Sequence, residues 1–389
     1  MKTDHRIIFS SSENMSALPS GSVDLVITSP PYPMIAMWDE MFCGQDGNIK
    51  KALQQGKAVS AFELMHRVLD RVWDEVERIL KKGGFACINI GDAARTIREN
   101  FMLYPNHSRI LQYMMGKGFT TLPVILWRKQ TNAPNKFMGS GMLPAGAYVT
   151  LEHEYILILR KGRKREFQRE REKQDRRMSA IFWEERNSWF SDVWMDLKGT
   201  VQKIPDGKSI RKRSGAFPFE LPYRLVNMFS VKGDLVVDPF YGIGTTMLAA
   251  MAAGRNSTGF EIEKGFQKSI ISRTVDAVDF SNQRINKRLD DHIEFVEKRF
   301  KDKGAFKHKN NNYGFPVITS QEKELLINQL ITVRKKEKNR FEAAYSDKPQ
   351  NEFCMDIPGY FSPKAEKKSV LSKRLKKSKK PVQLELPHK

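Results

Sequence analysis

The chain has 389 residues, enough for one large or two ordinary domains, and its 66 Lys and Arg against 45 Asp and Glu give a formal net charge of +21. So large a basic excess favours a polyanionic partner such as nucleic acid over a small neutral ligand. The three cysteines lie far apart without metal-ligand spacing, so neither a metal site nor a disulfide framework is expected. No apolar run suits a signal peptide or a membrane span, which predicts a cytoplasmic protein without a membrane partner.

The first part of the chain alternates predicted strands and helices. A short β-branched run over Ser22–Ser29 predicts a buried strand, and apolar residues at helical spacing predict a helix over Ala61–Gly84. The polar residues 43–60 between them predict a loop. Further strands are predicted over Gly84–Asp92, Thr121–Lys129 and Glu152–Gly162, with a helix that begins at Ser108 and ends at Gly116–Gly118. This alternation predicts an α/β fold with a mostly parallel sheet.

The later part of the chain begins with a strongly charged run over Arg160–Arg177, followed by three of the six tryptophans, Trp183, Trp189 and Trp194. Regular structure is then predicted as a strand over Asp234–Gly242, a helix over Thr245–Gly254, a strand over Ser257–Glu263 and a charged helical stretch over Lys264–Lys303. Because Thr319 and Glu322 have capping-box spacing, a smaller helical piece is predicted after them.

The last stretch, Phe361–Lys389, contains ten Lys and Arg against two Glu. It offers few side chains that could build a core, so it is predicted to be a disordered basic tail. Its cations are expected to add affinity for a nucleic acid without selecting a sequence.

A glycine-rich turn follows the strand that ends at Asp238. The chain passes through Gly242 and Gly244, and a helix begins at Thr245, so backbone and helix N-terminus can both approach a ligand. Glu261 lies 23 positions after Asp238, which suits the hydroxyls of a ribose. The P-loop lysine and the third glycine of a dinucleotide site are missing. A ligand with a ribose and a small carboxylate, such as S-adenosyl-L-methionine, therefore fits better, although many α/β domains have such a turn without a ligand.

A second distinctive stretch, Ser29-Pro30-Pro31-Tyr32, follows the first predicted strand. Two adjacent prolines stop a helix and remove two backbone donors, which leaves the tyrosine on a stiff loop. The stretch alone is compatible with an ordinary turn and with a rigid platform for a substrate.

Together the two stretches resemble the amino-group DNA methyltransferases, whose hallmarks are a (D/N/S)PP(Y/F) tetrad and a DPFxGxGT turn. Their order resembles the β group, in which the sheet is circularly permuted, and the similarity covers Ser22–Lys129 and Phe217–Glu263. Phe217 and Pro218 resemble the helix start beside the cofactor's methionine portion, with Arg213 and Ser214 where histidine and proline often stand. The resemblance implies a Rossmann-like fold that binds S-adenosyl-L-methionine through Phe217, Asp238, Pro239, Phe240, Gly242, Gly244, Thr245 and Glu261.

The resemblance also implies a catalytic role for Ser29, Pro30, Pro31 and Tyr32. An exocyclic amine is a poor nucleophile, and acceptors at Ser29 Oγ and the Pro30 carbonyl would favour a localised lone pair on it. Tyr32 would stack on a base that has left the duplex. Neither a metal nor a cysteine nucleophile is needed. Methylation at carbon 5 of cytosine is disfavoured because no cysteine follows a proline.

The family places target recognition in Thr131–Ser214. Its basic run and the later cluster of Lys208, Arg211, Lys212 and Arg213 are candidates for DNA contacts, while a solvated charged helix and a small local core explain the segment equally well. The expected division of the chain is a catalytic half over 1–130, the last sheet strand with target recognition over 131–214, a cofactor half over 215–303, a small helical extension over 304–360 and the tail over 361–389.

The leading hypothesis is a site-specific DNA methyltransferase acting on cytosine N4 of double-stranded DNA, because Ser29 stands where the family's adenine enzymes usually carry aspartate. It would protect host DNA from a cognate restriction endonuclease that need not bind it. The alternatives are an adenine-N6 or RNA methyltransferase and, from another class, a non-catalytic DNA-binding protein with a relic cofactor fold. The oligomeric state is left open.

Overall fold

The computed structural model describes residues 1–129, 138–199, 217–355 and 358–361. Its helices are α1 Asp39–Gln45, α2 Gly47–Gln54, α3 Ala58–Ile79, α4 Asn106–Gly116, α5 Glu170–Met178, α6 Trp183–Trp189, α7 Glu220–Phe229, α8 Thr245–Ala253, α9 Gln267–Val275 and α10 Ala277–Lys303. None of the helices in these ranges is long and apolar enough to cross a membrane.

The strands in the same ranges are β1 Lys2–Ile8, β2 Val23–Thr28, β3 Leu80–Ile90, β4 Ala93–Ile97, β5 Asn100–Tyr104, β6 Phe119–Thr121, β7 Ile125–Arg128, β8 Met138–Gly139, β9 Ala147–Tyr148, β10 His153–Lys161, β11 Val193–Trp194, β12 Leu235–Asp238, β13 Asn256–Phe260, β14 His308–Lys309, β15 Pro316–Val317, β16 Leu330–Glu337 and β17 Arg340–Tyr345. The main sheet has eleven strands, with the order β11-β7-β10-β3-β2-β12-β13-β1-β17-β16 and with β6 beside β10.

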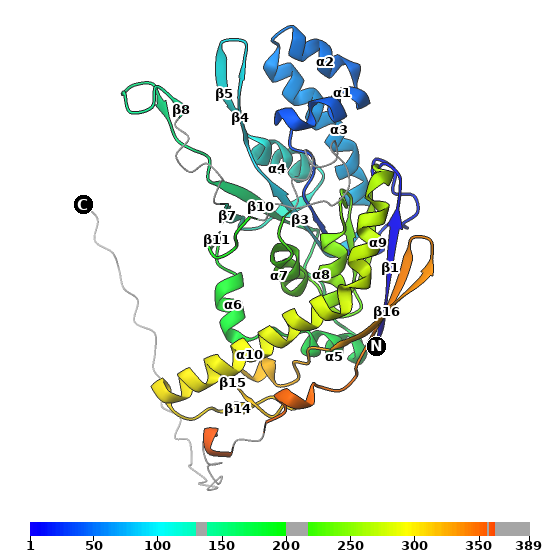
Figure 1. Ribbon diagram of the computed structural model, residues 1–389, viewed down its shortest axis with the longest axis vertical. Coiled ribbons are helices and arrows are strands. Elements are labelled where there is room, and N and C mark those ends of the chain that lie inside the picture. The colour runs from blue at the N-terminus through cyan, green and yellow to red at the C-terminus, as the bar shows by residue number, and fades with distance from the viewer. Residues whose placement is uncertain (130–137, 200–216, 356–357, 362–389) are drawn as a thin grey trace, which may run out of the picture.

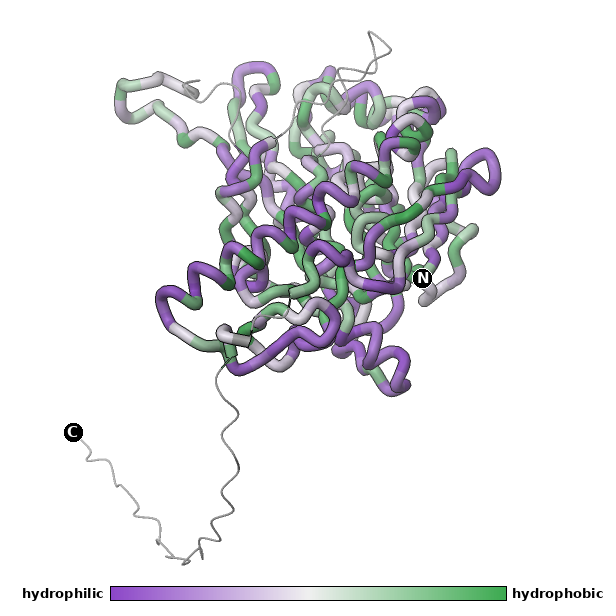
Figure 2. Tube along the Cα trace, turned by 60° about the horizontal axis from the view of Figure 1, so that its bottom comes forward, coloured by the Kyte–Doolittle hydropathy of each residue, from purple (hydrophilic) through white to green (hydrophobic). Residues whose placement is uncertain are grey.

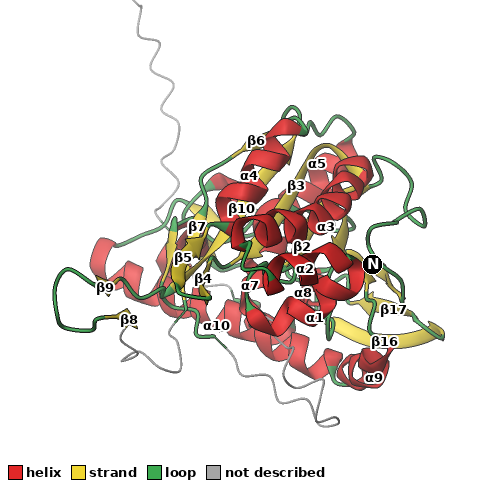
Figure 3. Ribbon diagram, turned by 90° about the horizontal axis from the view of Figure 1, so that it is seen from above, coloured by secondary structure: helices red, strands yellow, loops and turns green. Residues whose placement is uncertain are grey.

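The centre of the sheet is parallel. β3, β2, β12, β13 and β1 run in one direction, whereas β10 pairs antiparallel with β3 and β17 pairs antiparallel with β1. The predicted α/β fold is confirmed, and helices lie on both sides of the strands (Figures 1 and 3).

Alternate residues of the central strands face different helices. Val26 packs in a core cluster with side chains of α1 to α4. Leu25 and Ile27 pack in a second cluster with side chains of α7 and α8. The sheet is therefore buried on both faces, and every residue of β2 is buried, including the polar Asp24 and Thr28. Hydrophobic residues gather in the middle of the molecule and hydrophilic residues follow its outside (Figure 2).

The prediction of a loop over residues 43–60 is wrong. These residues form the end of α1, the whole of α2 and the start of α3. The Asp46 carboxylate caps α2 by accepting a hydrogen bond from the Asn48 amide, and Ile49 and Ala52 are buried against the core around α3. A few buried residues at helical spacing thus outweigh the polar composition of the segment.

The prediction of a helical extension over residues 304–360 is also wrong. The capping box at Thr319 and Glu322 exists, but it opens only a single 3₁₀ turn over Ser320–Glu322. The segment continues into the strand pair β16–β17, where Phe341, Ala343 and Tyr345 are buried at a spacing of two. This period belongs to a strand, and β17 joins β1 at the main sheet.

Candidate active site

A pocket lies along the edge where the parallel strands β2, β12 and β13 end. Their common direction brings Ser29, Pro239 and Glu261, which follow the three strands, to the same edge. The cavity measures about 380 Å³, and every residue predicted to act in catalysis or cofactor binding lines it except Gly244. Two motifs more than 200 positions apart in the chain therefore share one pocket.

Glycines shape the turn between β12 and α8. Gly244 adopts φ +82° at the N-cap of α8, a conformation that other residues rarely take. On the neighbouring strand, a Cβ at Gly259 would lie 1.7 Å from Cδ2 of Tyr241. The Tyr241 ring therefore lies directly on the backbone of β13, and its hydroxyl contacts the Met247 sulfur at 2.9 Å. These close contacts hold the turn against the sheet.

The Asp238 carboxylate ties together the elements on both sides of the turn. One oxygen accepts hydrogen bonds from Thr28 Oγ1 at 2.7 Å and the Phe240 amide at 3.1 Å, and the other accepts one from Thr246 Oγ1 at 2.6 Å. Burial raises the pKa of Asp238 to about 6, against these hydrogen bonds. Both oxygens already have partners, so this side chain joins the ends of β2 and β12 to α8.

Glu261 stands at the opposite wall of the turn. Its carboxylate accepts hydrogen bonds from the Gly242 amide at 2.7 Å and the Glu263 amide at 2.8 Å. Burial raises its pKa to about 7, although both backbone donors favour the charged form. Each oxygen retains acceptor capacity for a further donor, such as a hydroxyl of a ribose.

The remaining walls suit a ligand with an aromatic part and a small anionic part. Phe217, Phe240 and Ile262 supply apolar surface, and α8 begins at the pocket with its backbone donors. The Thr245 hydroxyl is buried and has no hydrogen-bond partner among the described residues. These residues could hold S-adenosyl-L-methionine, because they offer apolar surface, an acidic acceptor and unpaired donors in one cavity.

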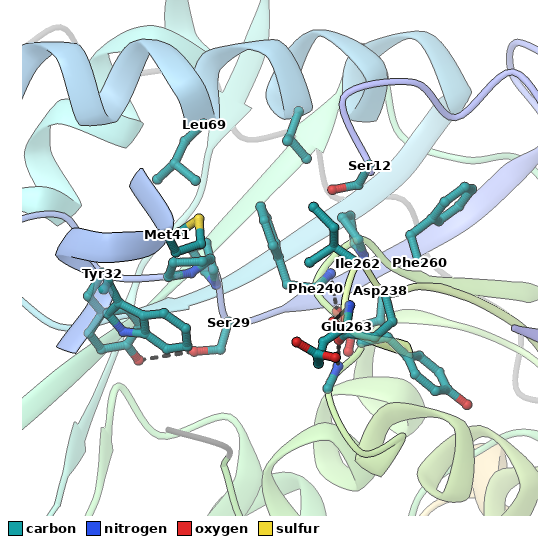
Figure 4. A pocket seen from close by; sticks show the side chains of 18 of the residues that line it. Ser12, Ser29, Tyr32, Met41, Leu69, Asp238, Phe240, Phe260, Ile262 and Glu263 are labelled. Carbon is teal, nitrogen blue, oxygen red and sulfur yellow. Dashed lines mark hydrogen bonds between the residues drawn. The ribbon is translucent and has the colours of Figure 1, made fainter. Parts of the chain in front are cut away.

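Ser29 and Tyr32 occupy the other end of the pocket, away from Asp238 and Glu263 (Figure 4). Ser29 Oγ lies 3.1 Å from the Tyr32 hydroxyl. A Cβ at Gly91 would lie 3.0 Å from Cε2 of Tyr32, so the end of β3 leaves room for the ring. The pair of prolines is therefore followed by a firmly held aromatic side chain.

Sequence reasoning missed three polar residues at this end. Tyr32 donates a hydrogen bond to Glu154 at 2.9 Å, and Asn89 Nδ2 donates to Glu154 at 2.7 Å and to the Tyr32 hydroxyl at 2.9 Å. Lys129 forms an ion pair with Glu154 at 2.9 Å. Glu154 is the second residue of β10, which runs antiparallel to β3, and this direction brings the side chain to the edge where β3 ends. The strand predicted over Glu152–Gly162 includes Glu154, but the prediction did not say that this strand runs antiparallel to its neighbour.

One set of proposed DNA-contacting residues is not covered by the structure. Lys208, Arg211, Lys212 and Arg213 fall outside the described residues, as does the chain after Phe361.

The charged run over Arg160–Arg177 lies partly at the opposite edge of the sheet. There Arg165 forms an ion pair with Asp234 at 2.7 Å, just before β12 begins. Two of the three neighbouring tryptophans, Trp189 and Trp194, are buried. Trp194 lies on β11 and packs in the second core cluster, and its indole N–H donates a hydrogen bond to the Trp189 carbonyl at 3.0 Å. Packing thus accounts for both aromatic side chains.

The fold and the pocket define the class of doubly wound α/β proteins, in which a doubly covered sheet presents a ligand pocket at the carboxyl ends of its strands. Comparison with known proteins narrows this class. The sequence model of the DNA methylase family that acts on amino groups matches residues 23–272, and the chain belongs to this family.

Close relatives extend over almost the whole chain. The type II methyltransferase M.MthZI of Methanothermobacter thermautotrophicus is 48% identical over 348 residues, which is 89% of this chain and 96% of the relative. The type II methyltransferase M.MjaI of Methanocaldococcus jannaschii is 45% identical over 307 residues, covering 76% of this chain and 97% of the relative.

A solved structure supports the same assignment. TTHA0409 of Thermus thermophilus, a candidate DNA modification methylase in complex with S-adenosyl-L-methionine, is 30% identical, covers 70% of this chain and 94% of its own, and has a TM-score of 0.55. The Rossmann-like methyltransferase fold is thereby confirmed. The chain is a DNA methyltransferase, and S-adenosyl-L-methionine is its cofactor.

Proposed function

We propose that this protein methylates the N4 amino group of cytosine at one short DNA sequence and protects that sequence from a cognate restriction endonuclease. The observation that carries the proposal is the uncharged Ser29 hydroxyl, which lies beside Pro30 in the same cavity as the glycine-rich turn. Relatives named as type II methyltransferases support the link to restriction and modification.

The catalytic end of the pocket prepares the target amine. Ser29 Oγ and the Pro30 carbonyl accept hydrogen bonds from its two N–H groups, which leaves the nitrogen lone pair free to attack. Pro30 and Pro31 carry no N–H and hold that carbonyl in place. Tyr32 stacks on the extruded base, with its ring packed beside Gly91 at the end of β3.

The cofactor end holds the methyl donor. When bound, S-adenosyl-L-methionine supplies an activated methyl group as a sulfonium, so positioning for in-line attack provides much of the rate. Glu261 accepts from the ribose hydroxyls, Phe217 and Phe240 provide apolar contacts, and the turn through Gly242 to Thr245 faces the carboxylate. Asp238 and Gly244 hold that turn in shape.

Residues 131–214, between the catalytic half over 1–130 and the cofactor half over 215–303, are assigned to the last sheet strand, β10, and to target recognition. Lys208, Arg211, Lys212 and Arg213 are proposed to contact backbone phosphates, and the basic tail to add affinity that does not depend on sequence. Exchanging the residues of this segment outside β10 with those of a relative should therefore change the methylated sequence and leave the chemistry of the product unchanged.

Mass spectrometry of nucleosides tests the product. DNA from a host without methyltransferases of its own, expressing this chain, is digested to nucleosides and compared with DNA from the same host expressing Ser29→Ala. We expect N4-methylcytosine with the unaltered chain and a large reduction with Ser29→Ala. A dominant N6-methyladenine signal would overturn the choice of base.

Methylation-aware sequencing of the same DNA tests the specificity. A single short sequence, modified at nearly every copy, is the expected result. Scattered modification without a common sequence would contradict the proposed protective role, because an endonuclease would then find unprotected sites.

A further inference from the structure

Glu154 takes part in a hydrogen-bonded cluster to which the proposed function gives no role. Its side chain is only 12% exposed and lies on the wall of the catalytic pocket. Oε2 contacts both the Tyr32 hydroxyl at 2.9 Å and Asn89 Nδ2 at 2.7 Å, and Oε1 contacts Lys129 Nζ at 2.9 Å. Three partners from three different segments therefore meet at one carboxylate.

The chemistry of these groups fixes which atom donates in each hydrogen bond. A carboxylate accepts only, so Tyr32 and Asn89 must both donate to Glu154. Burial and the neighbouring Glu154 charge raise the pKa of Tyr32 well above its usual value, which keeps its single proton in place. That proton is directed at Glu154, so the Tyr32 oxygen can act toward its other neighbours only as an acceptor.

This direction continues to Ser29. Ser29 Oγ lies 3.1 Å from the Tyr32 hydroxyl, and either atom could donate if the pair stood alone. Because the Tyr32 proton is directed at Glu154, Ser29 donates to Tyr32. The Ser29 hydroxyl has no second proton, so only its lone pairs remain for a group in the pocket.

The orientation of Asn89 fits the same direction. Its amide nitrogen faces Glu154 and Tyr32, whereas its oxygen is buried and has no hydrogen-bond partner among the described residues. Rotating the amide would place its oxygen against the carboxylate. A buried acceptor without a partner is unfavourable. The cluster therefore keeps the Asn89 amide protons directed at Glu154 and Tyr32 at the cost of leaving the Asn89 oxygen unpaired.

We propose that Glu154 is a positioning residue that sets the direction of the hydrogen bonds through Tyr32, so that Ser29 presents only lone pairs to the target amine. This inference rests on the proposed role of Ser29 as an acceptor. It accounts for a tyrosine hydroxyl in the tetrad, since a stacking ring alone does not need one. Lys129 balances the Glu154 charge at the pocket wall.

The test is Glu154→Gln, which keeps the shape of the side chain but no longer forces Tyr32 to donate its proton to residue 154. A glutamine amide can donate to Tyr32, which then can donate to Ser29 and turn the serine proton toward the base. We expect the rate of methyl transfer in a single turnover to fall at least about tenfold, the size of one hydrogen bond to a reacting group. The affinity for S-adenosyl-L-methionine should stay unchanged. The rate is followed with radiolabelled cofactor and unmethylated DNA amplified from a bacterial genome.

Glu152→Gln is the matched control. Glu152 lies two positions earlier, pairs with Arg128 at 2.9 Å and does not line the pocket. It loses the same charge without touching Tyr32, so its transfer rate should equal that of the unaltered chain. A Glu154→Gln enzyme as fast as this control would overturn the proposal.

Tyr32→Phe separates positioning from direct contact and provides a second test if Glu154→Gln does not fold. The ring remains while the hydroxyl that links Glu154 to Ser29 is lost, so this single substitution should already lower the transfer rate. In the double variant the second change should add almost nothing, because the link is already broken. Glu154 would not act through Tyr32 if the rate reductions of the two single variants multiplied in the double variant, or if Tyr32→Phe transferred methyl groups at the rate of the unaltered chain.

The outcome is independent of which base is methylated. The rates are compared with the unaltered chain on the same DNA, so an enzyme that produces N6-methyladenine would refute the proposed product and leave this test valid. Conversely, normal N4-methylcytosine formation by Glu154→Gln would refute the positioning role and leave the proposed function intact.

Discussion

The two ends of the pocket are built in different ways. The cofactor end comes mostly from one continuous stretch, in which β12, the turn, α8 and β13 follow each other between residues 235 and 261, with Phe217 added from just before α7. The catalytic end combines Tyr32, Asn89, Lys129 and Glu154, which lie on separate segments and meet only through the order and direction of the strands.

The two ends of the pocket therefore differ in what determines their geometry. Close packing such as the Tyr241 ring on Gly259 fixes the cofactor end, together with the hydrogen bonds that the Asp238 and Glu261 carboxylates accept within the turn and from its neighbours. At the catalytic end, the ring of Tyr32 is placed by packing but the direction of its hydroxyl depends on Glu154. Changes at the cofactor end should therefore alter the affinity for S-adenosyl-L-methionine. Changes at the catalytic end should alter capture of the target base and the rate of methyl transfer.

The largest effect is expected at Glu261. Glu261→Ala removes an acceptor that is proposed to take two charge-assisted hydrogen bonds from the ribose, each worth about 1.5–3 kcal/mol. Calorimetric titration of S-adenosyl-L-methionine should show a loss of affinity of at least about a hundredfold. Glu261→Gln serves as the control for shape. Unchanged affinity in a folded Glu261→Ala protein would remove this residue from the cofactor site.

Gly259→Ala tests the close packing of the cofactor end. The added Cβ would lie 1.7 Å from the Tyr241 ring, so the ring must move and the turn with it. Overpacking of this kind costs about 1–3 kcal/mol of unfolding free energy. Denaturant unfolding measures the loss, and Gly47→Ala, where a Cβ meets nothing within 4 Å, is the control. Equal stability of the two variants would show that this contact does not hold the turn.

Tyr32→Ala tests the stacking surface at the catalytic end. Loss of the ring should weaken capture of the extruded base by about 1–3 kcal/mol, the usual size of base–aromatic stacking. The effect is read as weaker binding of unmethylated DNA in the presence of cofactor, while cofactor affinity alone stays unchanged. If cofactor affinity fell by the same factor, the two ends would not be separate.

The smallest effect concerns pH. Because burial raises the pKa of Glu261 from 4.5 to about 7, the free protein holds a proton there below pH 7. The unfolded chain releases this proton at lower pH, so the contribution of Glu261 to stability falls as pH rises from 4.5 through 7. Cofactor affinity should change in the opposite direction, because the ionised carboxylate is the stronger acceptor. It should increase by no more than about tenfold per pH unit up to about 7 and then level off.

The same measurement on Glu261→Gln isolates the group responsible. Asp238 titrates nearby, with a pKa raised by burial to about 6, and remains in this variant. An affinity that still rises as steeply in Glu261→Gln as in the unaltered chain would assign the pH dependence to Asp238 instead.

The sequence predicts that the residues proposed for the cofactor end lie together, because the geometry of that stretch is local, and in the structure all of them except Gly244 line one pocket. Asp238, the two glycines and Glu261 lie on consecutive elements, and the parallel sheet follows from their alternation. Glu154 and Asn89 are not predictable in this way, because each is an ordinary polar residue within a strand. Their meeting depends on β10 running antiparallel to β3, and no local pattern encodes that direction.

The last strands were mispredicted for a related reason. The Thr319 capping box is a true local signal, but it governs only one turn, whereas β17 is fixed by pairing with β1 more than 300 residues away. The prediction for residues 43–60 was wrong in the opposite sense, since a loop was expected and helices form. A few buried apolar side chains hold two short helices there despite a polar composition.

The most direct test of this account measures two quantities on Ser29→Ala. One is the rate of methyl transfer to unmethylated DNA in a single turnover, and the other is the affinity for S-adenosyl-L-methionine. Removing a hydrogen-bond partner of the reacting group should slow transfer by about a hundredfold or more, as such losses do in other enzymes, and leave cofactor affinity within about twofold. Transfer at the full rate by Ser29→Ala would contradict the account, because the tetrad would then be an ordinary turn beside a cofactor pocket.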